Sequence, residues 1–290
     1  MREILVLSGK GGAGKTSICS ALISLAGSCL ACDYDVDASN LPLLFELSQV
    51  QEHSYSGGQV AIIDSDSCIL CGLCEQMCVY RAIQEGLVSQ LACEGCALCR
   101  YICPVDAVRM EARSSGRWFR GQRPDGKPMV YAELRPGEEN SGKLVAELKD
   151  QARQAALQEN LSLVLSDGPA GLGCPVISAL TAVDLVLMVA EPGVSGMEDL
   201  FRLYELVQKR PTRVALLINK HDLHALGSQR LQNWSREKEI PLLGKIPFSL
   251  EVADAIGSGQ NPLEIDWFRT IMEDVLEGMQ KALQSPIAIK

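Results

Sequence analysis

Two runs of closely spaced cysteines are the part of this sequence most able to do chemistry. The run Cys68-x-x-Cys71-x-x-Cys74-x-x-x-Cys78 recurs as Cys93-x-x-Cys96-x-x-Cys99-x-x-x-Cys103, and the five residues after each run also match, 79–83 against 104–108. A short duplicated unit explains this match better than chance does. Eight thiols in two matched quartets predict metal binding.

This spacing resembles that of two-cluster bacterial ferredoxins, where the fourth cysteine of each run ligates the other cluster. The resemblance implies two [4Fe–4S] clusters, one on Cys68, Cys71, Cys74 and Cys103, the other on Cys78, Cys93, Cys96 and Cys99. Zinc is the main alternative, but it prefers two separated C-x-x-C pairs. The sequence departs from the ferredoxin pattern at one position. The proline that follows the fourth cysteine is present after Cys103 but not after Cys78, so the shape of the loop after Cys78 is not predicted.

A phosphate-binding loop begins at Gly9. The segment 9–16 fits G-x-x-x-x-G-K-T, follows a predicted strand and opens a predicted helix. Lys15 is expected to reach the β- and γ-phosphates and the Thr16 hydroxyl to ligate Mg²⁺. The predicted nucleotide contacts are Gly11, Gly12, Ala13, Gly14, Lys15, Thr16, Ser17 and Asn219. A glycine-rich turn that binds nothing is the alternative, and the complete motif in this context disfavours it.

Acidic residues follow two predicted strands. Asp33, Asp35 and Asp37 lie at and after the second strand, and Asp167 ends a later one before Gly168. Carboxylates at the carboxyl ends of parallel strands can orient water and hold the hydration shell of a metal. We assign Asp167 to a Walker B role. The alternative is that some of them are turn residues.

The string Asn219-Lys220-His221-Asp222 ends another predicted strand. An amide at this position can hydrogen-bond a purine ring. The string also matches the N-K-x-D motif that reads guanine in GTPases, so Asp222 leaves GTP as an alternative nucleotide. The type of phosphate loop favours ATP. His221 is interpreted as a surface loop residue.

Alternating apolar strands and helical stretches position these motifs. The predicted strands are 4–7, 30–33, 161–167, 184–190, 213–219 and 242–246, and the predicted helices include 15–26, 143–159 and 195–209. This alternation predicts a P-loop NTPase of the α/β class, with a mainly parallel sheet and helices on both faces. The pattern breaks at the cysteine runs, which we interpret as an inserted ferredoxin-like α+β module. The predicted domains are 1–58 with 114–290, and 59–113, with 114–140 as connecting structure.

Composition narrows the class of protein. The chain has 290 residues, 47% of them hydrophobic and 22% charged, which allows one large α/β domain plus a small insert. A net charge of −9 without a basic run argues against nucleic acid as a partner. The first residues form a strand instead of a signal peptide, and no run approaches the roughly 20 apolar residues of a membrane span. We therefore expect a cytoplasmic protein with reduced thiols and no membrane partner.

Together these motifs resemble the MinD/Mrp/nitrogenase iron protein ATPases, in the form that carries a ferredoxin insert. Lys10 matches the early lysine of their deviant phosphate loop, K-G-G-x-G-K-T, and 167–171 matches their second switch loop, D-G-P-x-G. Segment 32–38 resembles their first switch loop, in which one aspartate activates the attacking water, and the resemblance favours Asp35 for that role, with Asp33 and Asp37 nearer the metal shell. Segments 136–145 and 191–196 resemble further family segments. The resemblance implies that Lys10 reaches nucleotide across a dimer interface. A plain solvated lysine is the alternative.

The family also implies dimers, with a second copy or a paralogous ATPase, that act in electron transfer or metallocluster assembly. The leading hypothesis is an ATPase that gates electron transfer, with a redox protein as partner. The alternative is an assembly or carrier protein for a metal cofactor, whose partner is a client protein. A positioning ATPase is disfavoured by the cluster insert.

The four remaining cysteines are interpreted separately. Cys19, Cys29 and Cys32 fall in predicted core segments. Cys174, just after the second switch loop, is interpreted as a buried residue at a helix start, with a redox or cluster-bridging role across a dimer as the alternative.

Overall fold

Strand β1 (Arg2–Ser8) lies in the middle of a nine-stranded sheet, and every residue of it after Arg2 is buried. The computed structural model describes residues 1–138 and 141–285 of the chain. In it β1 pairs in parallel with β8 on one side and β9 on the other. A continuous apolar run such as 4–7 is what a strand covered by helices on both faces requires.

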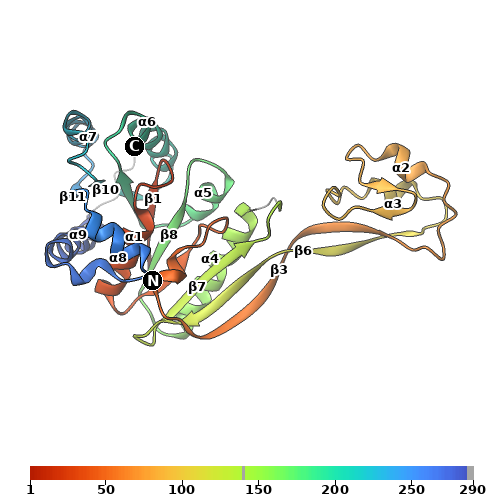
Figure 1. The fold of residues 1–290 in the computed structure, drawn as a ribbon, viewed down its shortest axis with the longest axis horizontal. Coiled ribbons are helices and arrows are strands. Elements are labelled where there is room, and N and C mark those ends of the chain that lie inside the picture. The colour runs from red at the N-terminus through yellow and green to blue at the C-terminus, as the bar shows by residue number, and fades with distance from the viewer. Residues whose placement is uncertain (139–140, 286–290) are drawn as a thin grey trace. The chain divides into compact units, whose positions relative to one another are not determined.

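The sheet has the strand order β11–β10–β9–β1–β8–β2–β7–β6–β3 (Figure 1). All pairs from β11 to β7 are parallel. The remaining strands are β2 (Leu30–Asp33), β3 (Ser48–Ile63), β6 (Val108–Gln122), β7 (Pro128–Leu134), β8 (Leu163–Ala170), β9 (Leu185–Ala190), β10 (Arg213–Asn219) and β11 (Leu242–Ile246). The predicted α/β class with a mainly parallel sheet is confirmed.

Helices pack on this sheet through alternate strand residues. Val6, Leu165 and Leu217 share one core cluster with residues of α1 and α9. Because successive strand side chains point to opposite faces, neighbours such as Leu5 turn to the other face, where α4, α5 and α6 contact the strands. The helices are α1 (Lys15–Ala26), α4 (Ser141–Gln158), α5 (Cys174–Ala179), α6 (Val194–Val207), α7 (Ala225–Glu237), α8 (Leu250–Gly257) and α9 (Asp266–Gln284), with short 3₁₀ turns η1 (Leu41–Leu44) and η2 (Pro262–Glu264). None of the described helices is long and apolar enough to cross a membrane.

The chain divides into two compact units. The larger unit is Met1–Glu52, Trp118–Glu133 and Ser141–Lys290, and the smaller unit is His53–Arg117 and Leu134–Asn140. The divisions at the start of the smaller unit and at its first return fall inside strands, β3 and β6. The sequence-based boundaries, 59 and 113, instead mark where the strand–helix alternation breaks around the cysteine runs.

The stretch 114–140 differs from the sequence-based expectation. It holds the end of β6 and all of β7, joined by a turn in which Arg123 N–H donates to the Lys127 carbonyl at 2.9 Å. The expectation of connecting structure was wrong because β7 is a largely apolar, buried strand that pairs in parallel with β2. β3 was also missed, since most of its residues are exposed and show no apolar alternation.

The smaller unit contains both cysteine runs in a repeated structure. Each run leads into a five-residue helix, α2 (Leu73–Met77) and α3 (Leu98–Ile102), and the two helices contact each other. The antiparallel strands β4 (Ile83–Gln84) and β5 (Leu87–Val88) follow the first run. The smaller unit has its own small hydrophobic core of five buried residues: Val60, Ala61, Ala82, Cys93 and Val108.

Backbone geometry repeats as well. Positive φ angles occur at matching positions of the two runs, Leu70 and Gly95, Gly72 and Ala97, and Arg81 and Asp106. The fourth cysteines also match, Cys78 with φ −75° and ψ 102° and Cys103 with φ −69° and ψ 116°. The missing proline after Cys78 therefore does not change the local turn.

Candidate functional site

The phosphate loop connects β1 to α1 at the carboxyl edge of the sheet. Gly14 precedes α1 with φ 87°, and Gly12 has φ 79°, so both adopt a left-handed conformation that favours glycine. A Cβ at Gly14 would also collide with the Asn219 amide. Lys15, the first helical residue, is buried. The loop geometry and the helix N-terminus together suit a phosphate.

Asn219 ties the end of β10 to this loop. Its Nδ2 donates to the Ala13 carbonyl at 2.9 Å, and the neighbouring Lys220 Nζ donates to the Gly12 carbonyl at 3.0 Å. The structure thus brings the predicted amide together with the phosphate loop. The amide group holds the backbone of the loop.

Thr16 and Asp167 form the candidate magnesium site. Thr16 Oγ1 donates to Asp167 Oδ2 at 2.5 Å. Asp167 Oδ1 is buried and has no hydrogen-bond partner among the described residues. Burial raises the pKa of Asp167 to about 6, although the nearby Lys15 ammonium and the Thr16 hydroxyl act in the opposite direction. A hydroxyl and an orphaned carboxylate oxygen fit the oxygen-rich surroundings that Mg²⁺ prefers.

The three aspartates of the first switch loop occupy different surroundings. Asp33 is fully buried, and its carboxylate accepts from Asp35 N–H (3.0 Å), the Ser39 hydroxyl (2.9 Å) and Leu41 N–H (3.1 Å). It therefore holds the loop, a role that the sequence did not suggest. The sequence analysis missed this role because the three donors lie in a turn whose shape no motif describes.

Asp35 is half-buried beside Lys15. Burial raises the pKa of Asp35, while the Lys15 ammonium lowers it and the carboxylate of Asp37 raises it. Asp37 itself is exposed. Of the three aspartates, Asp35 is therefore a partly solvated carboxylate that faces the phosphate-loop lysine.

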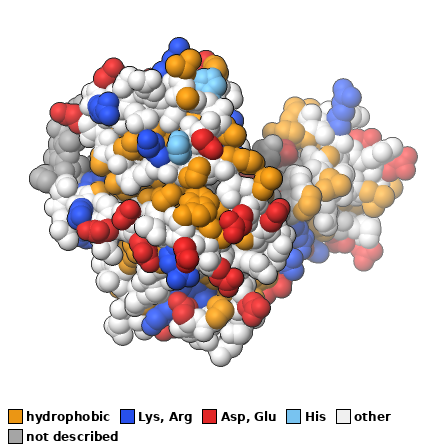
Figure 2. Space-filling model, turned by 60° about the vertical axis from the view of Figure 1, so that its left-hand side comes forward, with side chains coloured by type: hydrophobic (Ala, Val, Ile, Leu, Met, Phe, Trp, Pro, Cys, Tyr) orange, Lys and Arg blue, Asp and Glu red, His pale blue; other side chains and the backbone are white. Residues whose placement is uncertain are grey.

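A cavity of about 260 Å³ lies beside the phosphate loop. It is lined by Gly12, Gly14, Ser17, Asn219 and Lys220 on one side and by segment 246–249 and α8 on the other. Figure 2 shows apolar side chains gathered on one face of the larger unit, with cationic and histidine side chains beside them. An apolar cavity with one amide suits a nucleotide base. The sequence analysis missed the 246–249 wall.

Asp222 helps to shape this wall. Its Oδ1 accepts from Phe248 N–H at 2.7 Å, and His221 N–H donates to the Ile246 carbonyl at 3.0 Å. One oxygen of the carboxylate that would read guanine in an N-K-x-D motif is therefore engaged by the backbone. His221 contributes its backbone, which agrees with its interpretation as a loop residue.

Lys10 points to an acidic residue of its own chain. Its Nζ lies 3.4 Å from Glu191 Oε2, and Lys220 Nζ lies 3.9 Å from the same oxygen. Glu191 follows β9, so it links two loops that border the phosphate site. Both ion pairs are partly exposed, and each contributes little to stability by itself.

Residues 4–263 match the family described as the CobQ/CobB/MinD/ParA nucleotide binding domain. The uncharacterized protein MJ0578 of Methanocaldococcus jannaschii is 35% identical over 259 residues, which cover 88% of each chain. The chain belongs to the CobQ/CobB/MinD/ParA family. It has the P-loop ATPase domain of that family, and the glycine-rich loop described above is its phosphate loop.

Other relatives and solved structures agree with this assignment. The uncharacterized ATP-binding protein MJ0547 of the same organism is 23% identical over 90% of this chain and 80% of its own. Septum site-determining protein MinD of Pyrococcus horikoshii, complexed with Mg-ADP, has 17% identity and a TM-score of 0.59, covering 97% of this chain and 96% of that one. The MinC:MinD complex of Aquifex aeolicus has 16% sequence identity and a TM-score of 0.57, and the match covers 100% of this chain and 99% of that one. These structural matches show the CobQ/CobB/MinD/ParA fold.

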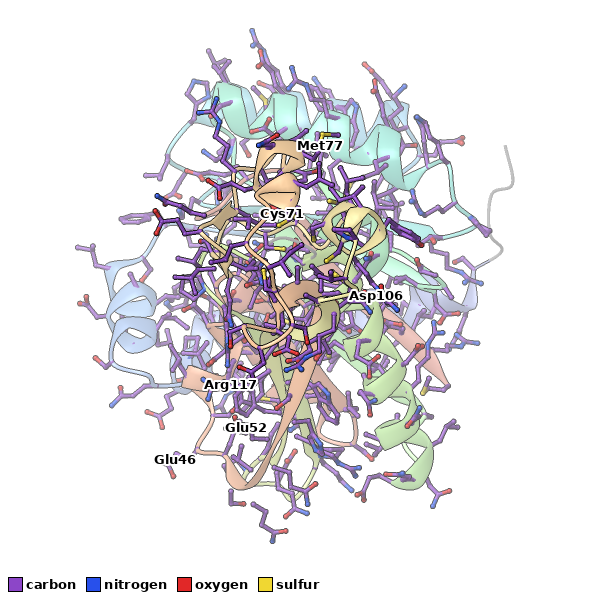
Figure 3. All side chains as sticks on the ribbon, turned by 90° about the vertical axis from the view of Figure 1, so that its right-hand side faces the viewer. Glu46, Glu52, Cys71, Met77, Asp106 and Arg117 are labelled. Atoms are coloured by element: carbon purple, nitrogen blue, oxygen red, sulfur yellow. The ribbon has the colours of Figure 1, made fainter. Side chains whose placement is uncertain are left out.

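Outside the nucleotide site, the eight cysteines of the runs line two cavities in the smaller unit. A cavity of about 390 Å³ is lined by Cys68, Cys71, Cys74 and Cys103. A second, of about 20 Å³, is lined by Cys78, Cys93, Cys96 and Cys99, with Cys74 also at its edge. Each cavity thus holds the first three cysteines of one run and the fourth cysteine of the other, and Cys74 borders both cavities. Figure 3 labels Cys71, Met77 and Asp106 on this unit.

The donor set fits an iron–sulfur cube. Ala82 N–H donates to Cys78 Sγ at 3.4 Å and Ala107 N–H donates to Cys103 Sγ at 3.3 Å, as suits thiolates. In the described residues no three His, Cys, Asp or Glu side chains converge on a single ion. An iron–sulfur cube holds its four thiolates farther apart than a single metal ion does. The site of a cube is therefore a cavity lined by cysteines, as found here. The smaller cavity must widen by side-chain movement to hold a cube.

The remaining cysteines lie in the larger unit. Cys19, Cys29 and Cys32 are buried, and burial raises the pKa of each thiol. They are core residues, as predicted. Cys174 begins α5 and is exposed, so the expectation that it is buried was wrong. It lies at the surface because α5 starts at the end of the loop that follows β8.

Proposed function

We propose that this chain couples ATP binding and hydrolysis to electron transfer through two [4Fe–4S] clusters in a ferredoxin-like insert. The observation that carries the proposal is that the four cysteines of each predicted quartet line one cavity together, although Cys74 of the first quartet also borders the second cavity. The spacing of the runs, the repeated backbone and the N–H groups directed at two sulfurs support it. Nucleotide chemistry and cluster chemistry then belong to one polypeptide.

The nucleotide half of the proposal assigns a role to each residue of the phosphate site. Lys15 and the loop N–H groups bind the phosphates, and Thr16 and Asp167 hold Mg²⁺. Asp35 orients the attacking water, and Lys10 acts from a second subunit. The base lies in the 260 Å³ cavity against Asn219, and the engagement of Asp222 by Phe248 N–H favours adenine over guanine.

The second half concerns the smaller unit. When bound, each cluster supplies one-electron transfer. The cysteines bind iron, and the N–H groups of Ala82 and Ala107 stabilise thiolate charge. Switch loops that respond to the γ-phosphate provide the means by which nucleotide state acts on the clusters or on a docked partner.

The active form is proposed to be a dimer, with a second copy or with a paralogous ATPase. The MinD of Aquifex aeolicus occurs in a complex with MinC, so a protein of this fold binds a partner protein. Relatives with 35% and 23% identity, MJ0578 and MJ0579, come from one organism, so chains of this kind coexist there. The further partner is a redox protein in the leading proposal.

An assembly or carrier function is the second candidate. It is favoured by the exposure of Cys71 and Cys96, because thiols at the surface suit the release of a cluster to a client protein. Quantitative transfer of iron and sulfide to an apo-client without redox cycling would support this candidate over electron transfer.

The decisive experiment is anaerobic reconstitution followed by iron and sulfide analysis and redox titration with ATP, with ADP and without nucleotide. We expect about eight iron atoms per chain, as two [4Fe–4S] clusters require, reversible reduction, and a potential or reduction rate that changes with nucleotide. Protein that takes up no iron contradicts the cluster proposal. Iron-loaded protein whose reduction potential and reduction rate are the same with ATP, with ADP and without nucleotide contradicts the coupling.

A further inference from the structure

A largely buried ion pair lies next to one of the two cysteine quartets. Arg113 Nε and Nη2 both donate to Glu138 Oε1, at 2.7 and 2.6 Å, and the two side chains are 16% and 10% exposed. Arg113 Nη1 donates to the backbone carbonyl of Cys93 at 3.0 Å. A cavity of about 50 Å³ borders all three residues. The guanidinium thus joins a carboxylate to the peptide group of a proposed iron ligand.

This contact breaks the symmetry of the repeat. Counted from the last cysteine of each run, the position that corresponds to Arg113 in the first repeat is Val88. Valine has neither charge nor a side-chain donor, so it cannot reproduce the contact at Cys68, the counterpart of Cys93. The two quartets therefore have matching cysteines but unequal electrostatic surroundings.

Burial strengthens the electrostatic effect of this pair. A charge in a site of low dielectric constant acts on its neighbours far more strongly than one in water. Strand β6 offers a comparison on the same unit, because Arg109 and Glu111 form a pair of 2.7 Å whose side chains are 65% and 50% exposed. Solvent screens that pair, but it screens Arg113 and Glu138 much less.

We propose that Arg113 and Glu138 set the reduction potential of the cluster held by Cys78, Cys93, Cys96 and Cys99 and so make the two clusters unequal. The inference rests on the proposed function, since it requires clusters in both quartets. Reduction adds one electron to a cluster without making or breaking a bond. The guanidinium favours that added negative charge and the carboxylate opposes it, so removing one partner exposes the effect of the other.

The test compares single substitutions in the full-length, anaerobically reconstituted protein. Reduction potentials of both clusters are measured by electron paramagnetic resonance during titration with dithionite and mediators. Glu138→Gln leaves the cation uncompensated and should raise one potential. Arg113→Gln leaves the anion uncompensated and should lower that same potential. The other cluster should not shift, and the exposed-pair controls Arg109→Gln and Glu111→Gln should shift neither.

Opposite shifts of one cluster are the required result, because loss of packing alone would not give the two substitutions opposite signs. If Arg113→Gln loses iron, Arg113→Lys keeps the charge and should restore both the iron and a potential near that of the unsubstituted protein. Shifts of equal sign, shifts of both clusters, no shift, or failure of Arg113→Lys overturn the inference. Unsubstituted protein without iron overturns the proposed clusters themselves, which iron analysis reveals before any titration.

Discussion

Lys15 is a buried cation whose nearest charged neighbours include two carboxylates, those of Asp35 and Asp167. Its ammonium lowers the pKa of both groups, against the effect of their burial. The same charge is available to nucleotide phosphates. At the scale of single residues, the site is therefore a balance between one cation and several buried or half-buried acids.

Lys15→Ala should weaken nucleotide binding by at least about 100-fold, roughly 3 kcal/mol, since it removes the one helix-start lysine of the phosphate loop. Equilibrium binding of a fluorescent ATP analogue and phosphate release measure this. Lys143→Ala, on the exposed side of α4, is the matched control and should change neither. Unchanged turnover in Lys15→Ala would remove the phosphate loop from the mechanism.

Asp167→Asn should abolish hydrolysis yet stabilise the nucleotide-free protein. The pKa of Asp167 is raised from 3.8 to about 6, so its ionisation costs the folded state roughly 3 kcal/mol at most above pH 6. Because the folded pKa exceeds the unfolded one, stability falls as pH rises from about 4 to about 6. Thermal melts should therefore show the variant as the more stable protein at pH 7.5 and the difference vanishing near pH 4. A less stable variant at pH 7.5 would contradict this reasoning.

The elements of the smaller unit are arranged so that helices α2 and α3 lie side by side, in contact with each other. Each helix begins after the second cysteine of its run and ends before the fourth. The fourth cysteine is thereby delivered to the opposite quartet. At this scale the exchange of cysteines between runs is a consequence of packing two copies of one small unit together.

Cys71→Ala and Cys96→Ala should each cost one cluster, and the two losses should affect different clusters. The reason is that these residues line different cavities. Iron content should fall by about half in each variant, as expected when one of two equal clusters is lost, and the double variant should retain little iron. Cys174→Ala is the control and should keep all of it. Full iron in Cys96→Ala would refute the proposed quartets.

The whole molecule joins a CobQ/CobB/MinD/ParA nucleotide-binding domain to a cysteine-rich unit through strands β3 and β6 and the chain that enters α4. α4 packs on α5, which follows the second switch loop. The assembly of two such molecules is the proposed active state.

Lys10→Ala should separate binding from turnover. Within one chain Lys10 pairs with Glu191, so its loss should change ATP affinity by less than about threefold, an effect below roughly 1 kcal/mol. If Lys10 acts across a dimer, turnover should fall at least tenfold and ATP-dependent dimers should be lost in light scattering. Lys209→Ala, at an exposed position, should change neither. Normal dimers and turnover in Lys10→Ala would make it a solvated lysine.

The sequence alone determined the features that depend on local spacing. The phosphate loop, the strands around it and the two cysteine runs are each set by residues a few positions apart, and apolar runs such as 185–190 predict buried strands without further information. The family resemblance and the α/β class follow from these features. Even the duplication of the cysteine unit can be read from the chain and returns in its backbone angles.

The tertiary structure decided what depends on partners distant in the chain. β3 shows no apolar alternation, and β7, although largely apolar, lies in a stretch rich in glycine, proline and charge, so the pairing of both strands shows only in the sheet. The same holds for the contact of Asp222 with Phe248 and the pairing of Arg113 with Glu138, which join residues separated by loops or whole elements. The physical reason is that burial and hydrogen-bond partners belong to the folded surroundings of a residue, and sequence spacing specifies only the nearest of them.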